Sequence, residues 1–182
     1  MNTLPAARLI SAAGHPLVLA PLSIALATRN LRLVAVFAAT AVLPLAAVIV
    51  RQVRRGAWTN FDVSRHEQRS GLYFVAFPIL AVAALALHFS GGGAQMTRGF
   101  YVATAMLAAG LLANRFLKVS LHMMIGAFSC AIIARVYPAA LPLIAVGLTL
   151  IAWSRRRLDA HTWPEIAVGL VIGIAAGAYL VL

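Results

Sequence analysis

Long apolar segments alternate with short polar links along the whole chain. A membrane-spanning helix needs about 20 predominantly apolar residues, and each apolar segment approaches that length. The pattern therefore predicts roughly six or seven spanning helices joined by short connections. The expected spans lie within residues 9–28, 33–50, 71–90, 99–114, 121–133, 139–153 and 166–182.

The first apolar segment contains two prolines, Pro16 and Pro21. Proline inside a helix removes a backbone hydrogen bond and bends or interrupts the helix. We therefore expect a kink in the first span, or a late start.

The amino-acid composition indicates that the apolar helices belong to a membrane protein. Hydrophobic residues make up 63% of the chain and the mean hydropathy is +0.93, whereas soluble domains are about 45–50% apolar. Spanning helices would use most of the 182 residues and leave no room for a soluble domain. We expect residues 1–182 to form a single integral-membrane domain of the all-α class, a polytopic transmembrane helical bundle.

The chain is strongly basic, with 15 Lys and Arg residues against four Asp and Glu residues. A basic protein of this kind can bind nucleic acid, an anionic membrane surface or an anionic substrate. No soluble basic face is expected, so we exclude nucleic acid and keep membrane lipids and an anionic substrate as partners. Cys130 is the single cysteine and lies in an apolar segment, so no disulfide framework or cysteine metal site is expected.

Polar side chains gather in residues 60–70, 118–122 and 154–165. Two expected spans separate each of these segments from the next, and two spans return the chain to the same membrane face. The three segments can therefore meet. Most of the cations fall on this face, so the positive-inside rule predicts that it is cytoplasmic, in the cell membrane.

The three segments supply the residue types that phosphoryl transfer uses. Fixed cations stabilise charge on the phosphoryl oxygens, and the arginine fork binds two oxygens at once. One histidine can attack phosphorus while another transfers protons. The candidates are Arg69, Lys118, Ser120, His122, Ser154, Arg155, His161 and Glu165.

The last segment carries a recognisable spacing. Ser154-Arg155, five residues, His161, three residues and Glu165 resemble the third motif of the type 2 phosphatidic acid phosphatase superfamily, Ser-Arg-x₅-His-x₃-Asp, with Glu in place of Asp. This superfamily contains the lipid phosphate phosphatases and is related to the vanadium haloperoxidases.

The other two motifs match in part. Ser120-Leu121-His122 resembles the second motif, Pro-Ser-Gly-His, with Val119 and Leu121 in place of Pro and Gly. In the first motif, Lys-x₆-Arg-Pro, the arginine corresponds to Arg69, while Asp62 and Ser70 stand at the Lys and Pro positions. The resemblance runs from about residue 60 to the C-terminus and implies a phosphatidic acid phosphatase type 2-like core.

The resemblance also assigns roles. It implies that His161 attacks phosphorus and that His122 protonates the leaving alkoxide and then assists water. Glu165 would hold the tautomer of His161 by a hydrogen bond, as in a catalytic triad. No metal or cofactor is implied. The phosphate-binding set would be Arg69, Ser120, Ser154 and Arg155. As a separate hypothesis, we suggest that Lys118 replaces the missing lysine of the first motif.

Structural interpretations stand beside these roles. Thr162, Trp163, Pro164 and Glu165 also form a capping-box pattern at a helix start, a role that can coexist with catalysis. Ser120 could be only a helix N-cap. Simple structural roles are expected for the following residues: Arg156 and Arg157 as topogenic charges, His15 and His88 as packing residues, and Trp58, Trp153 and Trp163 as interface anchors.

We therefore expect a metal-independent membrane phosphatase that hydrolyses a lipid phosphate or polyprenyl (pyro)phosphate through a phosphohistidine. One alternative is a lipid phosphotransferase of the same superfamily, in which an alcohol replaces water. Another is a catalytically inactive membrane protein that keeps an anionic-lipid site.

Overall fold

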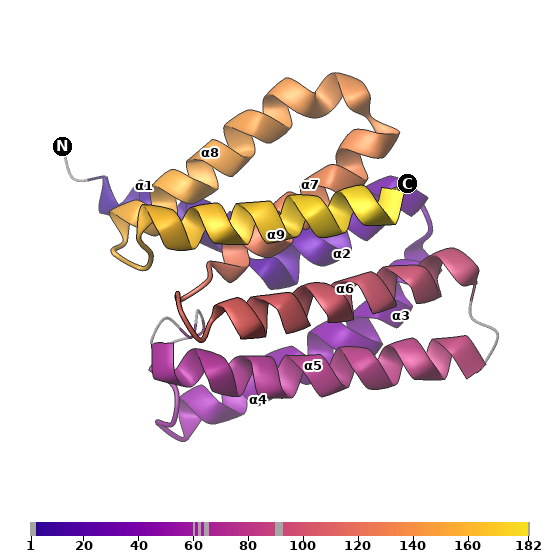
Figure 1. Cartoon of the computed structure of the whole chain (residues 1–182), viewed down its shortest axis with the longest axis horizontal. Helices are drawn as coiled ribbons and strands as arrows, with labels where there is room; N and C mark the ends of the chain where they lie inside the picture. Colours follow the sequence, from indigo (N-terminus) through magenta and orange to yellow (C-terminus); the bar gives the residue numbers. More distant parts are fainter. Residues whose placement is uncertain (1–2, 60, 62, 64–65, 90–92, 182) are drawn as a thin grey trace. The chain divides into compact units, whose positions relative to one another are not determined.

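The computed structural model describes residues 3–59, 61, 63, 66–89 and 93–181, and all regular elements in these residues are helical. The predicted all-α class is confirmed. The elements are α1 (Leu4–Ala13), α2 (Pro16–Thr28), α3 (Leu31–Phe37), the π-helical stretch η1 (Ala38–Val42), α4 (Leu43–Arg54), α5 (His66–Phe89), α6 (Ala94–Ala113), α7 (Leu121–Val136), the 3₁₀ turn η2 (Pro138–Ala140), α8 (Leu141–Arg157) and α9 (Trp163–Val181) (Figure 1).

Many of these helices have the length and composition of membrane spans. Within the described residues five helical segments are long and apolar enough to cross a membrane, and the bent pair α1–α2 makes six if it counts as one span. The count of six candidate spans, with the bent pair taken as one, agrees with the lower end of the predicted six or seven. The segment expected as a further span is α7, whose 16 residues extend only about 24 Å, against a hydrocarbon core of about 30 Å.

The expected kink in the first span is confirmed. Helices α1 and α2 meet at an angle of 48°, and the break falls at Gly14 and His15. Pro16 opens α2, a position where its missing N–H would have no intrahelical acceptor. His15 is the N-cap, and its Nδ1 atom accepts a hydrogen bond of 3.2 Å from the backbone N–H of Leu17.

The helices pack as two compact units, which are described separately. The first comprises Met1–Leu33 and Leu117–Leu182, and the second comprises Val34–Phe116. In the first unit α7 packs against both α9 and α2, while α1 packs against α8. In the second unit α5 packs against α6, α4 and η1. The single integral-membrane domain expected from the sequence stays a prediction.

Close contact between α7 and α9 depends on glycines that follow one face of α9. A Cβ atom on Gly169 would come within 2.6 Å of the carbonyl oxygen of Ser120, and one on Gly173 would overlap the carbonyl oxygen of Met124. Gly177 is equally close to Ala131. Small residues four apart let two helix backbones approach directly. As a result, α7 and α9 run side by side (Figure 1), with the starts of both helices held together.

Candidate functional site

The turn after α8 sets the position of His161. The backbone N–H groups of Ala160 and His161 both donate to the carbonyl oxygen of Arg155, at 3.1 and 3.3 Å. Asp159 makes this reversal possible by adopting a left-handed conformation (φ 49°), which Asp tolerates better than most residues. The bond from Ala160 to Arg155 is the long bond of a Schellman helix ending. The spacing from Arg155 to His161 is thus that of a helix-terminating turn.

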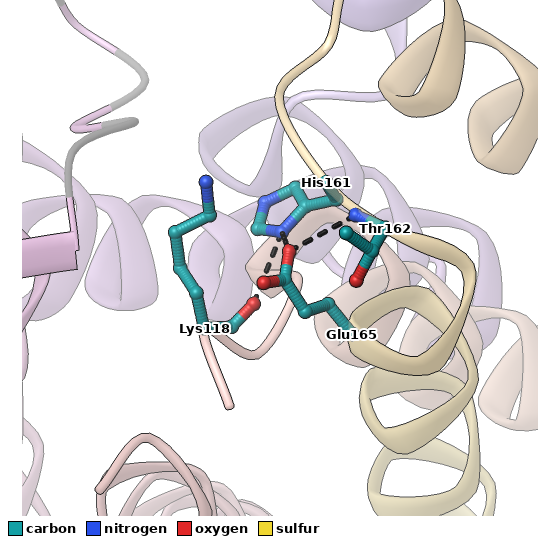
Figure 2. A network of polar contacts seen from close by, with 4 residues as sticks. All are labelled: Lys118, His161, Thr162 and Glu165. Atoms are coloured by element: carbon teal, nitrogen blue, oxygen red, sulfur yellow. Dashed lines mark hydrogen bonds and ion pairs between the residues drawn. The ribbon is translucent and has the colours of Figure 1, made fainter. Parts of the chain in front are cut away.

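Glu165 closes the start of α9. Its Oε2 atom accepts a hydrogen bond of 3.0 Å from the backbone N–H of Thr162, which precedes the first helical residue. This is the reciprocal bond of a capping box, so the capping role of Glu165 is confirmed, while the Thr162 side chain has no capping hydrogen bond in the described residues. The same oxygen lies 3.0 Å from Nδ1 of His161 (Figure 2). One carboxylate therefore caps the helix and contacts the imidazole.

The imidazole of His161 contacts two oxygen acceptors through one nitrogen. Its Nδ1 atom lies 3.0 Å from Oε2 of Glu165 and 3.0 Å from the carbonyl oxygen of Lys118 (Figure 2). A carboxylate and a carbonyl only accept hydrogen bonds, so Nδ1 carries the proton. In the neutral ring the lone pair then sits on Nε2. The His161 side chain is fully buried.

The same contacts join two of the segments predicted to meet. Lys118 binds His161 through its carbonyl oxygen, and the backbone N–H of Ser120 donates to the carbonyl oxygen of Glu165 at 3.2 Å. Figure 2 shows the Lys118 amine on the side of the imidazole away from Glu165. Residues 118–122 and 154–165 therefore converge where α7 and α9 begin.

Ser120 stands at the N-cap of α7, but its side chain makes no capping hydrogen bond. The residue is fully buried, and its Oγ atom has no hydrogen-bond partner among the described residues. A buried hydroxyl without a partner costs free energy, which a phosphate oxygen would offset. The first turn of a helix also presents unbonded N–H groups and the positive end of the helix dipole. This position is suited to an anion.

His122 lies in the first turn of α7 and is buried. Its ring stands edge-to-face with that of His15, with centroids 5.2 Å apart and ring planes at 89°. The sequence led us to treat His15 as a packing residue. A contact between residues so distant along the chain has no signal in their local sequence.

Arg155 is completely buried and donates from a terminal guanidinium nitrogen to Oγ of Ser11, which is also buried. Sequence reasoning did not single out Ser11. The neighbouring Ser154 donates its hydroxyl proton to the carbonyl oxygen of Ile151 at 2.8 Å, so the helix backbone already uses that proton. The phosphate-binding role of Ser154 stays a prediction.

Arg156 and Arg157 differ from Arg155 in that both are exposed. Arg156 forms a surface ion pair of 3.0 Å with Asp159, and Arg157 donates to Oγ1 of Thr3 at 2.7 Å. An open cavity of about 300 Å³ lies on this outer side, lined by Trp153, Arg156, Arg157, Asp159 and Trp163. The lining residues do not include His161 or its contacts, Glu165 and Lys118.

Arg69 belongs to the second unit, where it is buried on α5. Its predicted phosphate contact stays a prediction of the sequence. Asp62 and Arg65, which precede it in the first segment, lie outside the described residues.

A search of the described residues for groups of three or more His, Cys, Asp or Glu side chains that could hold a metal ion finds none. Comparison with known proteins adds no assignment, because no family model, curated protein or solved structure matches the chain. The functional interpretation therefore depends on the geometry around His161.

Proposed function

We propose that this chain is a membrane phosphatase that hydrolyses a lipid phosphate or a polyprenyl (pyro)phosphate through a phosphohistidine, without a metal ion. The proposal includes a phosphatidic acid phosphatase type 2-like core and a site on the cytoplasmic face of the cell membrane. The observation that carries it is the buried His161, whose Nδ1 proton is held by Glu165 and the Lys118 carbonyl. In this tautomer the lone pair is on Nε2, which is the attacking atom in the proposal.

In the first step Nε2 of His161 forms a bond to phosphorus while the bond from phosphorus to the lipid oxygen breaks. His122 donates a proton to the leaving alkoxide, which departs as an alcohol. The imidazole becomes a positively charged phosphohistidine. The carboxylate of Glu165, hydrogen-bonded at Nδ1, stabilises that positive charge.

In the second step a water oxygen attacks phosphorus, and His122, now neutral, accepts the proton that the water loses. The bond between phosphorus and Nε2 breaks, and its electron pair returns to the imidazole. Inorganic phosphate leaves and both histidines regain their starting protonation states. The two steps together consume one water and require no oxidant, reductant or cofactor.

Phosphate binding in the proposal uses groups at the start of α7 and the end of α8. The buried Ser120 hydroxyl can donate to a phosphoryl oxygen, and the buried guanidinium of Arg155 supplies a positive charge. The amine of Lys118 is proposed to take the place of the motif-one lysine. Apolar helices that carry these groups suit a substrate whose tail lies in lipid.

Purified protein in detergent or nanodiscs, given a panel of lipid phosphates, tests the proposal through release of inorganic phosphate. His161→Ala removes the nucleophile and should lower the rate at least about 10³-fold. His88→Ala is a matched control, because His88 is an exposed histidine of α5, and it should keep the wild-type rate. Equal phosphate release by wild type and His161→Ala would overturn the proposal.

A further inference from the structure

We propose that the bent helix pair α1–α2 is part of the active site, with His15 positioning the ring of His122 and Ser11 positioning the guanidinium of Arg155. This inference rests on the proposed function and deepens it. Neither Ser11 nor His15 lies in the part of the chain that carries the phosphatase-like motifs.

Packing places each half of the pair against one helix of the site. Helix α1 packs on α8, which carries Arg155, and α2 packs on α7, which carries His122. The break between α1 and α2 fits closely against α8, because a Cβ atom on Gly14 would come within 2.8 Å of the Ile151 side chain. The bend thus directs residues on its two sides toward different site residues.

His15 is itself held rigidly. Its Nδ1 atom accepts from the backbone N–H of Leu17 at 3.2 Å, which fixes the ring plane and, for the neutral ring, places the N–H on Nε2. The terminal torsion of a histidine is otherwise broad. Through the edge-to-face contact, with ring centroids 5.2 Å apart, the fixed ring of His15 restricts the orientation of the His122 ring. A general acid needs such orientation, because proton transfer depends on its alignment with the leaving oxygen.

Ser11 acts on the cation instead. Its Oγ atom accepts a hydrogen bond from the buried Arg155 guanidinium. Ser11 is uncharged, so this contact orients the guanidinium without neutralising it. An arginine fork aligned in this way can present two N–H groups to phosphate oxygens.

Three substitutions separate the two contacts of His15. His15→Asn keeps a good N-cap acceptor for α2 and removes the ring, His15→Phe keeps a ring and removes the acceptor, and His15→Ala removes both. If His15 positions His122, the Asn and Ala variants should lose about tenfold or more in kcat, with KM nearly unchanged. The Phe variant keeps the ring contact with His122 but loses the bond from the Leu17 N–H that fixes the ring plane, so it should recover only part of the kcat. If His15 were only a helix cap, the Asn variant would stay close to wild type and the Phe and Ala variants would lose activity. That result would overturn the assignment of His15.

Ser11→Ala tests the second contact, and Ser11→Thr, which keeps the hydroxyl, is its control. The Ala variant should raise KM and weaken the binding of orthovanadate, a mimic of five-coordinate phosphorus, by roughly tenfold. The Thr variant should stay close to wild type. Equal vanadate affinity for wild type and Ser11→Ala would overturn the role of Ser11.

Orthovanadate binding by the purified wild-type protein separates failure of this inference from failure of the proposed function. If the wild type releases phosphate and His15→Asn has the full wild-type kcat, the role of His15 is overturned and the proposed function is not. Vanadate binding without phosphate release would remove the phosphatase function and with it the role of His15, which is defined by kcat, while the vanadate affinities of Ser11→Ala and Ser11→Thr would still decide the role of Ser11. Wild type with neither property would overturn both.

Discussion

The imidazole of His161 donates from Nδ1 toward two oxygens, one from Glu165 and one from the backbone of Lys118. In a catalytic triad the carboxylate alone fixes the histidine tautomer, and replacing that carboxylate by its amide lowers kcat about 10⁴-fold. Here the Lys118 carbonyl can hold the same tautomer without Glu165. In the proposed mechanism, the main contribution of the carboxylate is then to stabilise the positive charge of the phosphohistidine.

Glu165→Gln should therefore lower kcat by about 10–100-fold, well short of the loss seen when a triad carboxylate is the sole acceptor. The Gln side chain can still accept from the Thr162 N–H, so α9 should remain capped and the melting temperature should change little. Steady-state phosphate release and thermal unfolding in detergent check these expectations. A loss near 10⁴-fold would show that the Lys118 carbonyl does not fix the tautomer.

Individual site residues were predictable from the sequence to the extent that spacing along one segment determined their contacts. The contact from His161 to Glu165 and the capping bond from Thr162 to Glu165 both follow from a three- or four-residue spacing at a helix start. The alternative in which Ser120 is a helix N-cap gives its position correctly, yet its hydroxyl does not cap the helix.

The contacts of Ser11 and His15 had no such signal. Their partners lie more than 100 residues away in the chain, so only tertiary packing reveals them.

At the scale of elements, the packing of α7 on α9 aligns the two helix starts that carry Ser120 and Glu165. The glycines at positions 169, 173 and 177 recur every four residues, which is the pattern of close helix contact in membranes. This pattern is visible in the sequence and could have predicted that another helix packs closely against this face of α9. It does not identify α7 as the partner.

Gly169→Ala introduces a Cβ atom that would come within 2.6 Å of the carbonyl oxygen of Ser120. Overpacking of this kind costs about 1–3 kcal/mol, and it displaces the start of α7 from His161. We expect a lower melting temperature in detergent together with reduced phosphate release.

Gly147→Ala is the matched control, because a Cβ atom at Gly147 of α8 meets nothing within 4 Å. Alanine is also the better helix former, so this variant should be at least as stable as wild type. If both alanine variants behaved like wild type, the close glycine contact would not be needed for the site.

The break at Gly14 and His15 could be predicted from the sequence only in part. Pro16 correctly predicted an interruption, since proline is favoured at the first helical position and disfavoured inside a helix. The direction of the 48° bend, however, depends on the packing of α1 on α8 and of α2 on α7.

At the scale of the whole molecule, alternation of apolar and polar segments predicted an all-helical protein whose helices are long enough to span a membrane. In the described residues every regular element is helical, and five helical segments, or six with the bent pair α1–α2, have the length and composition of membrane spans. Convergence of residues 118–122 with residues 154–165 was also predicted, because two expected spans separate the segments, and backbone and side-chain hydrogen bonds join them in the structure. The division into two compact units depends on contacts between distant helices. No local pattern marked it.

A phosphatase that uses a histidine nucleophile needs no divalent cation to activate water or to bind phosphate. We therefore expect phosphate release to be unchanged by EDTA, and orthovanadate to inhibit it. Rates measured after chelation, and again after Mg²⁺ is restored, check this expectation. Activity that disappears with EDTA and returns with Mg²⁺ would contradict the metal-free mechanism.

The central claim is that Nε2 of His161 becomes covalently bound to phosphorus. The most direct measurement mixes the purified protein with a lipid phosphate that carries labelled phosphorus and quenches the reaction rapidly during turnover. The labelled peptide is then identified by mass spectrometry. We predict a label on His161 that survives alkali and is lost in acid, as expected for a phosphoramidate, and that is missing from His161→Ala. Turnover of the substrate without any label on His161, or a label that persists in His161→Ala, would contradict the account.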